Sequence, residues 1–455
     1  MALNESGAIS LAGSTTGESI ALELGLSETG AISLNDEVVR TLSGIASGAI
    51  VMPTNFYGAS DTVVGPLFFQ GYNSYSNKGN GNNTSENSFV QAAGAAGARS
   101  DWKDLAMSSR TGRPPTLAVD DSGRLWSWGF NSRGALGINI AGNIYRNSPC
   151  QIGSSTNWDS VSTGSWGTDR TSCAAVKTNG QVYAWGDNYF QQLTSWAITG
   201  TRNPCSSPVQ MTTGNINQTY NQVISGVSKT FLCGYQNYIV KNNGTMYSAG
   251  SNYQGAGGVN YQYGDHGFEP VAGGITDWKE ATSASGGNNN GYFLRENGGL
   301  YAAGNSYAGA NARPNQPPFF NSSPIYIGGN YKTVQGINTG GMAIKNNGTL
   351  WTWGRNHDGQ CGVGSTVALS SPTQIGSLNT WDKFFKGHVA DNAAAMIKTD
   401  GTIWGVGAVA SGLDINAPNG YFSSPIQIFA NLTNAKTVAQ ICNMGSTQGT
   451  MALVE

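Results

Sequence analysis

A short pattern of apolar and polar positions recurs along most of this chain. In its clearest copy, the apolar pair Ala343–Ile344 precedes Asn347–Gly348, and the run Leu350–Trp353 follows and ends at Gly354. Asn-Gly between two apolar runs predicts a β-hairpin, because both residues tolerate the positive φ that a tight turn between twisted strands requires. The glycine after the second run indicates a strand end, where a neighbouring backbone can approach closely.

The pattern has six copies, and their turn glycines are 50 to 64 residues apart. These glycines are Gly123, Gly180, Gly244, Gly298, Gly348 and Gly401. Repetition of one all-β unit at a period of about 50 residues is typical of β-propellers, in which each repeat forms one small sheet, or blade. The repeat therefore predicts a propeller.

Two further strands are predicted around most hairpins, which gives four strands per blade. One strand begins with an aromatic residue before the hairpin. The other begins with a proline after the hairpin, because proline lacks an N–H and belongs at a strand start. The aromatic residues are Trp102, Trp158, Trp278, Tyr331 and Trp381. The prolines are Pro149, Pro208, Pro270, Pro324, Pro372 and Pro425.

The two ends of the repeat region each carry half of the hairpin pattern. Residues 65–73 match its second half, and residues 450–455 match its first half. We therefore expect one blade to be completed by strands from both ends of the domain, which removes the open edges of a linear array. Together with the six internal hairpins, this split hairpin predicts an all-β, seven-bladed propeller over residues 59–455.

Residues 1–58 do not follow the repeat and form a separate predicted unit. They contain three short Gly-Ala-Ile stretches that resemble strands. A short helix is predicted over residues 35–44, because Asn35 or Asp36 is a good N-cap and Gly44 can end the helix. A small α+β module of this size buries little surface by itself. We expect it to dock onto another protein or to form a homo-oligomer.

Two family resemblances accompany these patterns. The run Asn-Gly-x-Leu-Trp-x-Trp-Gly-x-Asn at residues 347–356, with a Ser-Pro strand after it, resembles the repeat of the regulator of chromosome condensation family. That resemblance covers about residues 59–455 and implies a seven-bladed propeller. Residues 30–44 and 47–58 are similar to N-terminal segments of structural proteins from tailed bacteriophages. The second resemblance implies that residues 1–58 attach the protein to a virion.

Composition and charge exclude several classes of function. Charged residues make up 11% of the chain, against roughly 25% in ordinary globular domains. The net charge is −2 and there is no block of Lys or Arg, which argues against nucleic acid as a partner. No apolar run is long enough to span a membrane, and the N-terminus does not read as a secretory signal. The six cysteines form no C-x-x-C pair, so we expect reduced, mostly buried thiols.

No catalytic or metal-binding constellation is evident. His266, His357 and His388 lie in different repeats without metal-ligand spacing, and the chain lacks the common hydrolase and phosphate-binding motifs. Asp120 and Asp400 belong to hairpin turns, where we expect them to cap the turn. The prediction is a protein that is not an enzyme, with no cofactor and no metal. We expect the hairpin tryptophans to form the core between blades: Trp126, Trp128, Trp185, Trp351, Trp353 and Trp404.

Insertions into the repeat are where binding residues are expected, because loops on a rigid scaffold commonly carry recognition. The longest insertion contains residues 191–221, and another covers residues 252–269. Tyrosine with glycine, asparagine and aspartate suits adaptable polar recognition. The second insertion is the predicted surface-binding loop, and its candidate residues are Tyr253, Tyr261, Tyr263, Asp265 and His266.

These observations lead to one main hypothesis and three alternatives. The main hypothesis is a structural protein of a tailed-phage virion, as a tail fibre or baseplate component. It would bind other virion proteins through residues 1–58 and a host-surface glycan or protein through the propeller. The alternatives are a capsid decoration or head-fibre protein, an intracellular interaction protein resembling a GTPase exchange factor, and a glycan-cleaving enzyme. The enzyme would need a pair of facing carboxylates, which the sequence does not reveal.

Overall fold

The structure is a computed structural model of the 455-residue chain. All described residues belong to one unit, Val64–Glu455. The predicted module at residues 1–58, its helix at 35–44 and the boundary at 58 lie outside the described residues. The structure describes residues 65–71, 73, 75–94, 97–107, 115–165, 170–193, 203–213, 222–284, 290–313, 319–337, 339–385, 393–409, 420–428, 437–441 and 450–454.

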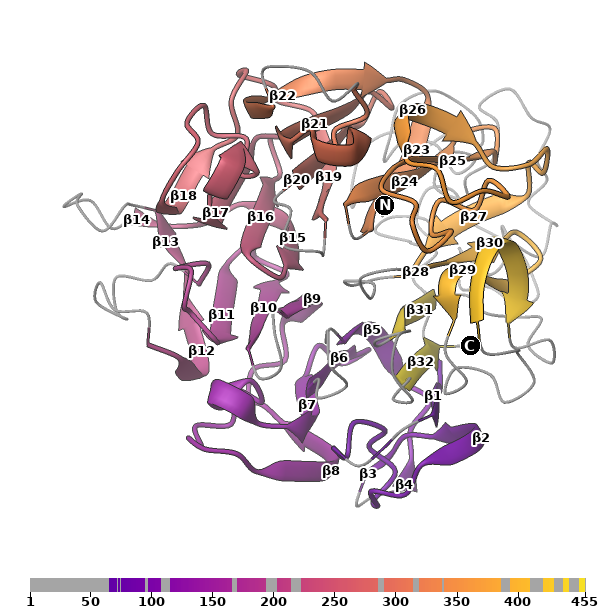
Figure 1. Ribbon diagram of the computed structural model, residues 1–455. Coiled ribbons are helices and arrows are strands. Elements are labelled where there is room, and N and C mark those ends of the chain that lie inside the picture. Colours follow the sequence, from indigo (N-terminus) through magenta and orange to yellow (C-terminus); the bar gives the residue numbers. More distant parts are fainter. Residues whose placement is uncertain are drawn as a thin grey trace, which may run out of the picture. The chain divides into compact units, whose positions relative to one another are not determined.

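Seven four-stranded antiparallel sheets are arranged as blades around one axis (Figure 1). This confirms the predicted seven-bladed propeller. In six of these blades, strands that are consecutive in the chain are neighbours, and the first of the four lies nearest the axis, whereas the seventh blade combines strands from both ends of the unit. Among the helices in the described part of the chain, none is long and apolar enough to cross a membrane.

We number the blades in order around the ring and give their strands from the axis outward. Blade I holds β31 (Thr437–Ile441), β32 (Thr450–Val454), β1 (Leu67–Gly71) and β2 (Glu86–Gln91). Blade II holds β5 (Trp102–Met107), β6 (Pro115–Asp120), β7 (Leu125–Phe130) and β8 (Tyr145–Gln151). Blade III holds β9 (Trp158–Ser165), β10 (Thr171–Lys177), β11 (Val182–Gly186) and β12 (Cys205–Gln210).

The other four blades follow the same plan. Blade IV holds β15 (Val227–Cys233), β16 (Gln236–Lys241), β17 (Met246–Ser251) and β18 (Asp265–Pro270). Blade V holds β19 (Trp278–Ser283), β20 (Asn290–Arg295), β21 (Leu300–Asn305) and β22 (Phe320–Gly328). Blade VI holds β23 (Tyr331–Ile337), β24 (Gly340–Lys345), β25 (Leu350–Gly354) and β26 (Leu369–Gln374). Blade VII holds β27 (Trp381–Phe384), β28 (Ala393–Lys398), β29 (Ile403–Val409) and β30 (Gly420–Ile428).

Short elements join or extend the blades. Two-stranded ribbons are formed by β3 (Ala93–Gly94) with β4 (Gly97–Ala98) and by β13 (Thr212–Thr213) with β14 (Gln222–Val223). In the described residues, three 3₁₀ turns follow the third strands of their blades, and they are η1 (Ser132–Gly134), η3 (Tyr253–Gly255) and η4 (Tyr307–Gly309).

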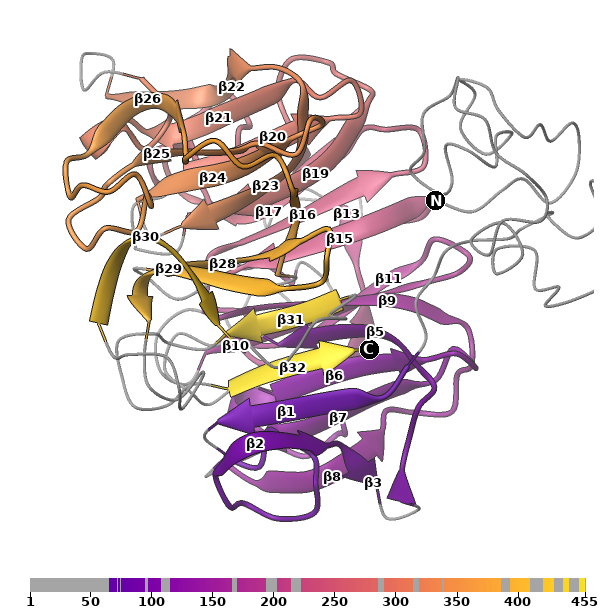
Figure 2. The same cartoon turned by 90° about the vertical axis from the view of Figure 1, so that its right-hand side faces the viewer.

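Blade I is built from both ends of the described unit, as the split hairpin predicts. Strand β1 pairs antiparallel with β32, from Leu67 opposite Val454 to Gly71 opposite Thr450. Figure 2 shows β31, β32, β1 and β2 side by side in one sheet. This pairing leaves no open blade in the ring and therefore removes the free strand edges that a linear array would expose.

The inner strands of blades II to VII share a β-bulge directly after their first residue. In blade II the register shifts between Trp102 and Asp104, and in blade V between Trp278 and Glu280. The same shift occurs in blades III, IV, VI and VII. A bulge turns its residue out of the ladder. The bulged residues are therefore brought to one end of the axis: Lys103, Asp159, Ser228, Lys279, Lys332 and Asp382.

Tryptophans of the third strands hold neighbouring blades together. Trp128, Trp185 and Trp353 are fully buried. Each indole Nε1 donates a hydrogen bond to a loop carbonyl of the preceding blade: Trp128 to Asn77 at 2.9 Å, Trp185 to Ala135 at 2.9 Å and Trp353 to Ala310 at 3.2 Å. The aromatic core therefore also carries the polar contacts between blades.

The prolines do not begin the outer strands, which corrects the sequence prediction. Pro149 lies inside β8 and Pro372 inside β26. In both blades the register between the third and outer strands shifts beside the proline. Because the outer strand is an edge strand and the shifted residues leave the ladder, the missing N–H of proline is tolerated there. The proline marks a bulge rather than a strand start.

Candidate functional site

The predicted binding loop joins β17 to β18, and we call residues 252–264 the Tyr loop. One buried side chain fixes its shape. The Asn252 Nδ2 donates to the Tyr261 carbonyl at 2.6 Å, and its Oδ1 accepts from the Gly257 N–H at 2.9 Å. Asn131 holds the corresponding loop of blade II in the same way. The sequence signal for this device is the asparagine two residues after the glycine that ends the hairpin.

The next blade also holds the Tyr loop in place. The Asn260 N–H donates to the Ser322 carbonyl at 2.7 Å, and the Ser323 hydroxyl donates to Asn260 Oδ1 at 2.9 Å. Gly255 has a φ of +85°, and a Cβ there would lie 2.7 Å from the Ser322 Cα. The loop is therefore a close-packed part of the scaffold, so its side chains have defined positions.

Two of the candidate tyrosines lie together and face solvent. Tyr253 is 51% exposed and Tyr263 is 61% exposed. Their rings meet edge to face with centroids 5.9 Å apart. Tyr307 occupies the corresponding position in the loop of blade V and is 55% exposed. This places exposed aromatic side chains on the outer loops of two neighbouring blades.

The remaining candidates are less exposed than these two tyrosines. His266 is fully buried, packs edge to face on Tyr261 at 6.0 Å, and has Nδ1 3.0 Å from the Gly267 carbonyl. Burial lowers the pKa of His266 to about 4, so the ring is neutral at physiological pH. Burial and the adjacent Glu269 carboxylate raise the pKa of Tyr261. Asp265 is half-buried at the start of β18. Sequence reasoning did not select Glu269.

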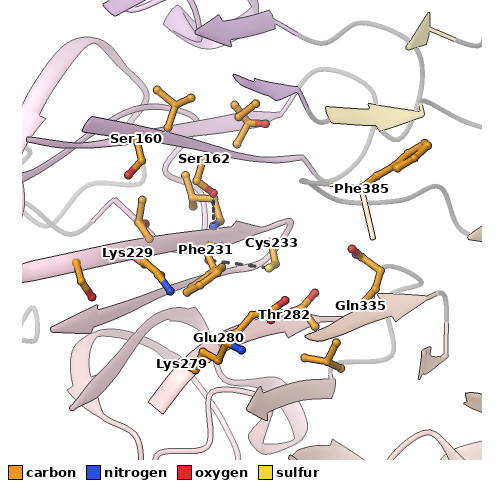
Figure 3. Close-up of a pocket in the computed structure, with 18 of the residues that line it drawn as sticks. Ser160, Ser162, Lys229, Phe231, Cys233, Lys279, Glu280, Thr282, Gln335 and Phe385 are labelled. Carbon is orange, nitrogen blue, oxygen red and sulfur yellow. Dashed lines mark hydrogen bonds between the residues drawn. The ribbon is translucent and has the colours of Figure 1, made fainter. Parts of the chain in front are cut away.

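A second candidate site lies on the axis, and sequence reasoning missed it. The inner strands β9, β15, β19 and β23 surround a pocket of about 430 Å³ (Figure 3). Phe231 and Val334 contribute to its apolar walls, and Lys229, Lys279 and Glu280 bring charged groups to it. The only sequence signal is the position directly after the first residue of each inner strand. Residues at this position become neighbours only when the blades close into a ring.

The acidic residues of the hairpin turns, Asp120 and Asp400, have structural roles. The Asp120 carboxylate is fully buried and accepts hydrogen bonds from Arg99, from the Arg124 backbone and side chain, and from Trp126 Nε1. Burial opposes the charge of Asp120, but these donors hold its pKa below the ordinary value. Asp400 accepts from the backbone and hydroxyl of Thr402 across its turn. Both acids cap hairpins, as predicted.

The thiols and histidines form no metal centre in the described residues, where no group of three His, Cys, Asp or Glu side chains could hold an ion. Five cysteines are described, all of them free, and Cys173, Cys233 and Cys361 are buried. Burial raises the pKa of Cys233 to about 11 and that of Cys361 to about 12. The buried thiols are therefore protonated and unreactive. Cys442 and His388 lie outside the described residues, and His357 is exposed.

Comparison with known proteins supports the first resemblance. The family model of the regulator of chromosome condensation (RCC1) repeat matches residues 122–168 and 347–388. These two stretches are similar to the RCC1 repeat. The E3 ubiquitin-protein ligase HERC2 of Homo sapiens is 29% identical over 165 residues, which cover 34% of this chain and 3% of HERC2. HERC2 of Mus musculus is 30% identical over the same length. The chain thus matches only a small part of these long relatives.

Solved RCC1-type propellers share the fold. Prp20p from Saccharomyces cerevisiae has a TM-score of 0.63 and 17% identity, with 87% of this chain and 92% of Prp20p covered. Human WBSCR16 has a TM-score of 0.63 and 14% identity, with 86% and 99% covered. One structure of yeast RCC1 (Prp20) holds it bound to Kap60. At these identities the likeness shows the fold alone.

These comparisons contradict the phage hypothesis. The relatives of the propeller are eukaryotic proteins from human, mouse and yeast. The predicted virion location and the tail-fibre, baseplate and capsid roles are therefore wrong, and the comparisons do not support virion partners. The similarity at residues 1–58 was drawn from two short runs, residues 30–44 and 47–58. Such local signals report backbone conformation and occur in unrelated proteins.

Proposed function

We propose that this RCC1-repeat propeller binds protein partners, without catalysis, through the Tyr loop of blade IV and the adjacent loop of blade V. The observation that carries the proposal is the exposure of Tyr253, Tyr263 and Tyr307 on loops that the scaffold holds rigidly. A rigid loop loses little conformational entropy on binding, so more of the contact energy becomes affinity.

Tyrosine suits this role for a physical reason. Its ring supplies a large contact area with few rotatable bonds, and its hydroxyl can satisfy a polar partner. Residues of this kind dominate the binding energy of many protein interfaces. The low charge of the chain, 11% with a net charge of −2, favours recognition by aromatic and polar contacts over electrostatic attraction.

The structural neighbours make a protein a better partner than a glycan. Prp20p is described with its binding to Gsp1p and histones, and yeast RCC1 with Kap60. These partners belong to those proteins. Both structures are of Prp20, and every partner named for it is a protein. A pair of exposed tyrosines on a fixed loop suits a protein partner here as well.

Full-length protein carrying Tyr253→Ala, Tyr263→Ala and Tyr307→Ala tests the proposal. The matched control carries Tyr326→Ala and Tyr421→Ala, which are equally exposed but lie on outer strands. Affinity capture with quantitative mass spectrometry should find a protein that wild type and control retain and that the triple variant retains about tenfold less. Equal capture of every protein by the two variants would contradict the proposal. Nucleotide release from a captured GTPase would distinguish exchange from simple binding.

A further inference from the structure

The axial pocket reaches the end of the ring opposite the Tyr loop. The inner strand of blade V begins beside the hairpin turn of blade IV, because the Trp278 N–H donates to the Gly244 carbonyl at 2.9 Å. The Tyr loop follows β17, whose other end carries that turn. The bulged residues Asp159, Ser228 and Lys279 all line the pocket and stand at this end. The pocket is therefore separate from the proposed protein-binding surface.

Most charges at this end of the axis are neutralised in pairs. Lys103 pairs with Asp159 at 2.7 Å, and Lys332 pairs with Asp382 at 2.6 Å. Each pair joins the bulge of one blade to the bulge of the next. Such pairs leave no net charge for a ligand.

Two lysines at the pocket have no such partner. Lys279 Nζ donates to the Lys332 carbonyl at 3.0 Å, and Lys229 is exposed on the neighbouring inner strand. Among the described residues, no ion pair joins either amine to a carboxylate. The nearby carboxylate is Glu280, which accepts a hydrogen bond from the Thr333 hydroxyl at 3.1 Å. Asp159 also lines the pocket, but its charge is balanced by Lys103. With that pair set aside, two amines face one carboxylate, which leaves an excess of one positive charge.

The deeper walls of the pocket are largely apolar. Phe231, Val161, Val334 and Phe385 line them, and Figure 3 shows Phe231 beside Lys229, with Phe385 on the far side. One polar atom is left over. The Thr163 hydroxyl lines the pocket, is 1% exposed, and has no hydrogen-bond partner among the described residues. A buried hydroxyl without a partner is unfavourable, so a ligand atom that bonds to it would be stabilised.

We propose that this pocket binds an organic monocarboxylate with an apolar body. The carboxylate lies between Lys229 and Lys279, the body packs on Phe231, and the Thr163 hydroxyl bonds to a polar atom at the inner end. Ligand pockets of about 300 to 1,000 Å³ hold compounds of this size. The same chemistry is offered by a small organic acid and by a carboxylate of a peptide, and the pocket recognises the feature that they share.

Full-length protein should be titrated with 4-phenylbutanoate and, separately, with its neutral amide, by calorimetry and ligand-observed NMR. We expect the acid to bind at least about tenfold more tightly than the amide, because the charged head forms charge-assisted hydrogen bonds. The double substitution Lys229→Met and Lys279→Met should remove this preference. The control Lys177→Met alters an amine that lies over Trp158 and Tyr183, outside the pocket, and should leave it unchanged.

A second variant separates binding from folding. Phe231→Leu should weaken both compounds while keeping the preference for the acid, and thermal unfolding should show that every variant is folded. Equal affinity for acid and amide, or no binding of the acid at millimolar concentration, would overturn the proposal. An apolar peptide with a free C-terminus, compared with its amidated form, identifies the source of the carboxylate. Because none of these changes touches the Tyr loop, the result is independent of the proposed protein binding.

Discussion

The Trp185 Nε1 donates a hydrogen bond to the Ala135 carbonyl oxygen at 2.9 Å across the boundary between blades II and III. Both residues are fully buried. The bond joins the third strand of one blade to the outer loop of the preceding blade, and Trp128 and Trp353 repeat it elsewhere. Ring stability therefore rests on polar contacts at the blade boundaries as well as on apolar packing.

Trp185→Phe should destabilise the propeller by about 1 to 3 kcal/mol, because the ring is retained in part while a buried hydrogen bond is lost. Urea denaturation measures the change in the free energy of unfolding. Trp351→Phe is the control. The Trp351 indole is half-buried and bonds to Thr349 within its own hairpin. The Trp351→Phe substitution should therefore lower the free energy of unfolding by less. Equal effects would show that the contact between blades contributes little.

The loop that carries Ala135 also requires a glycine beneath the indole. Gly137 has a φ of +67°, and a Cβ there would lie 2.7 Å from Trp185 Nε1. Gly153 has a φ of +64°, but no atom lies within 4 Å of its added Cβ. Gly153→Ala should therefore cost only the backbone strain, about 1 to 2 kcal/mol. Gly137→Ala should cost about 1 to 3 kcal/mol more, because of the clash. Thermal unfolding of the two variants gives the comparison.

Closure of the ring by β32 predicts the effect of a truncation. Removal of residues 450–455 leaves the inner edge of β1 without its partner over five registered pairs. An exposed strand edge recruits other chains, so the truncated protein should aggregate and unfold at lower temperature. Removal of Glu455 alone, which β32 does not include, should have no effect. Size-exclusion chromatography with light scattering detects the difference. A monomeric truncated protein of normal stability would contradict this role for β32.

Local sequence signals predicted the features that depend on neighbouring residues. The Asn-Gly turns and the split hairpin predicted the blades and the completion of one blade by strands from both ends, which the pairing of β1 with β32 confirms. The sequence shows only that Pro149 lacks an N–H, and this predicted a strand start. A bulge in an edge strand tolerates a missing N–H equally well, and Pro149 lies at such a bulge inside β8.

The candidate sites were less predictable because they depend on contacts between blades. His266 lies in a loop-like sequence, but it pairs opposite Gly250 in β18, where it is buried against Tyr261. The axial pocket joins Ser162, Lys229 and Lys279 from three blades, and no spacing along the chain marks them as neighbours. The exposure of Tyr253 and Tyr263, by contrast, follows from a polar insertion outside the hairpin pattern.

Asn252→Ala should open the Tyr loop, because the side chain bonds to both Tyr261 and Gly257. Hydrogen exchange should rise at residues 253–264, and protein binding through the loop should fall. Asn131→Ala removes the equivalent contacts in blade II and should cost similar stability, about 1 to 3 kcal/mol, without changing binding. If both variants lose binding equally, the loss reflects general destabilisation rather than the Tyr loop.

Blade II differs from its neighbours in the charge opposite the first residue of its inner strand. Asp120 stands opposite Trp102, whereas four other blades place a lysine over aromatic rings at this position: Lys177, Lys241, Lys345 and Lys398. Arg99 supplies the cation instead, lying over Trp102 and Trp126 and pairing with Asp120 at 2.7 Å. The buried acid is thus required to hold an arginine from outside the hairpin.

Asp120→Asn should destabilise the propeller by about 2 to 3 kcal/mol at neutral pH, because hydrogen bonds to a charged group are lost. The pKa of Asp120 is lower in the folded state than in the unfolded state. Its contribution to the free energy of unfolding is therefore fully present above the unfolded pKa of about 4, and it is lost as the pH falls through the folded pKa. The difference in unfolding free energy between wild type and variant should therefore narrow in acid. Asp121→Asn, at an exposed carboxylate beside Ser122, is the control. A difference that stays constant with pH would show that the charge of Asp120 is not what stabilises blade II.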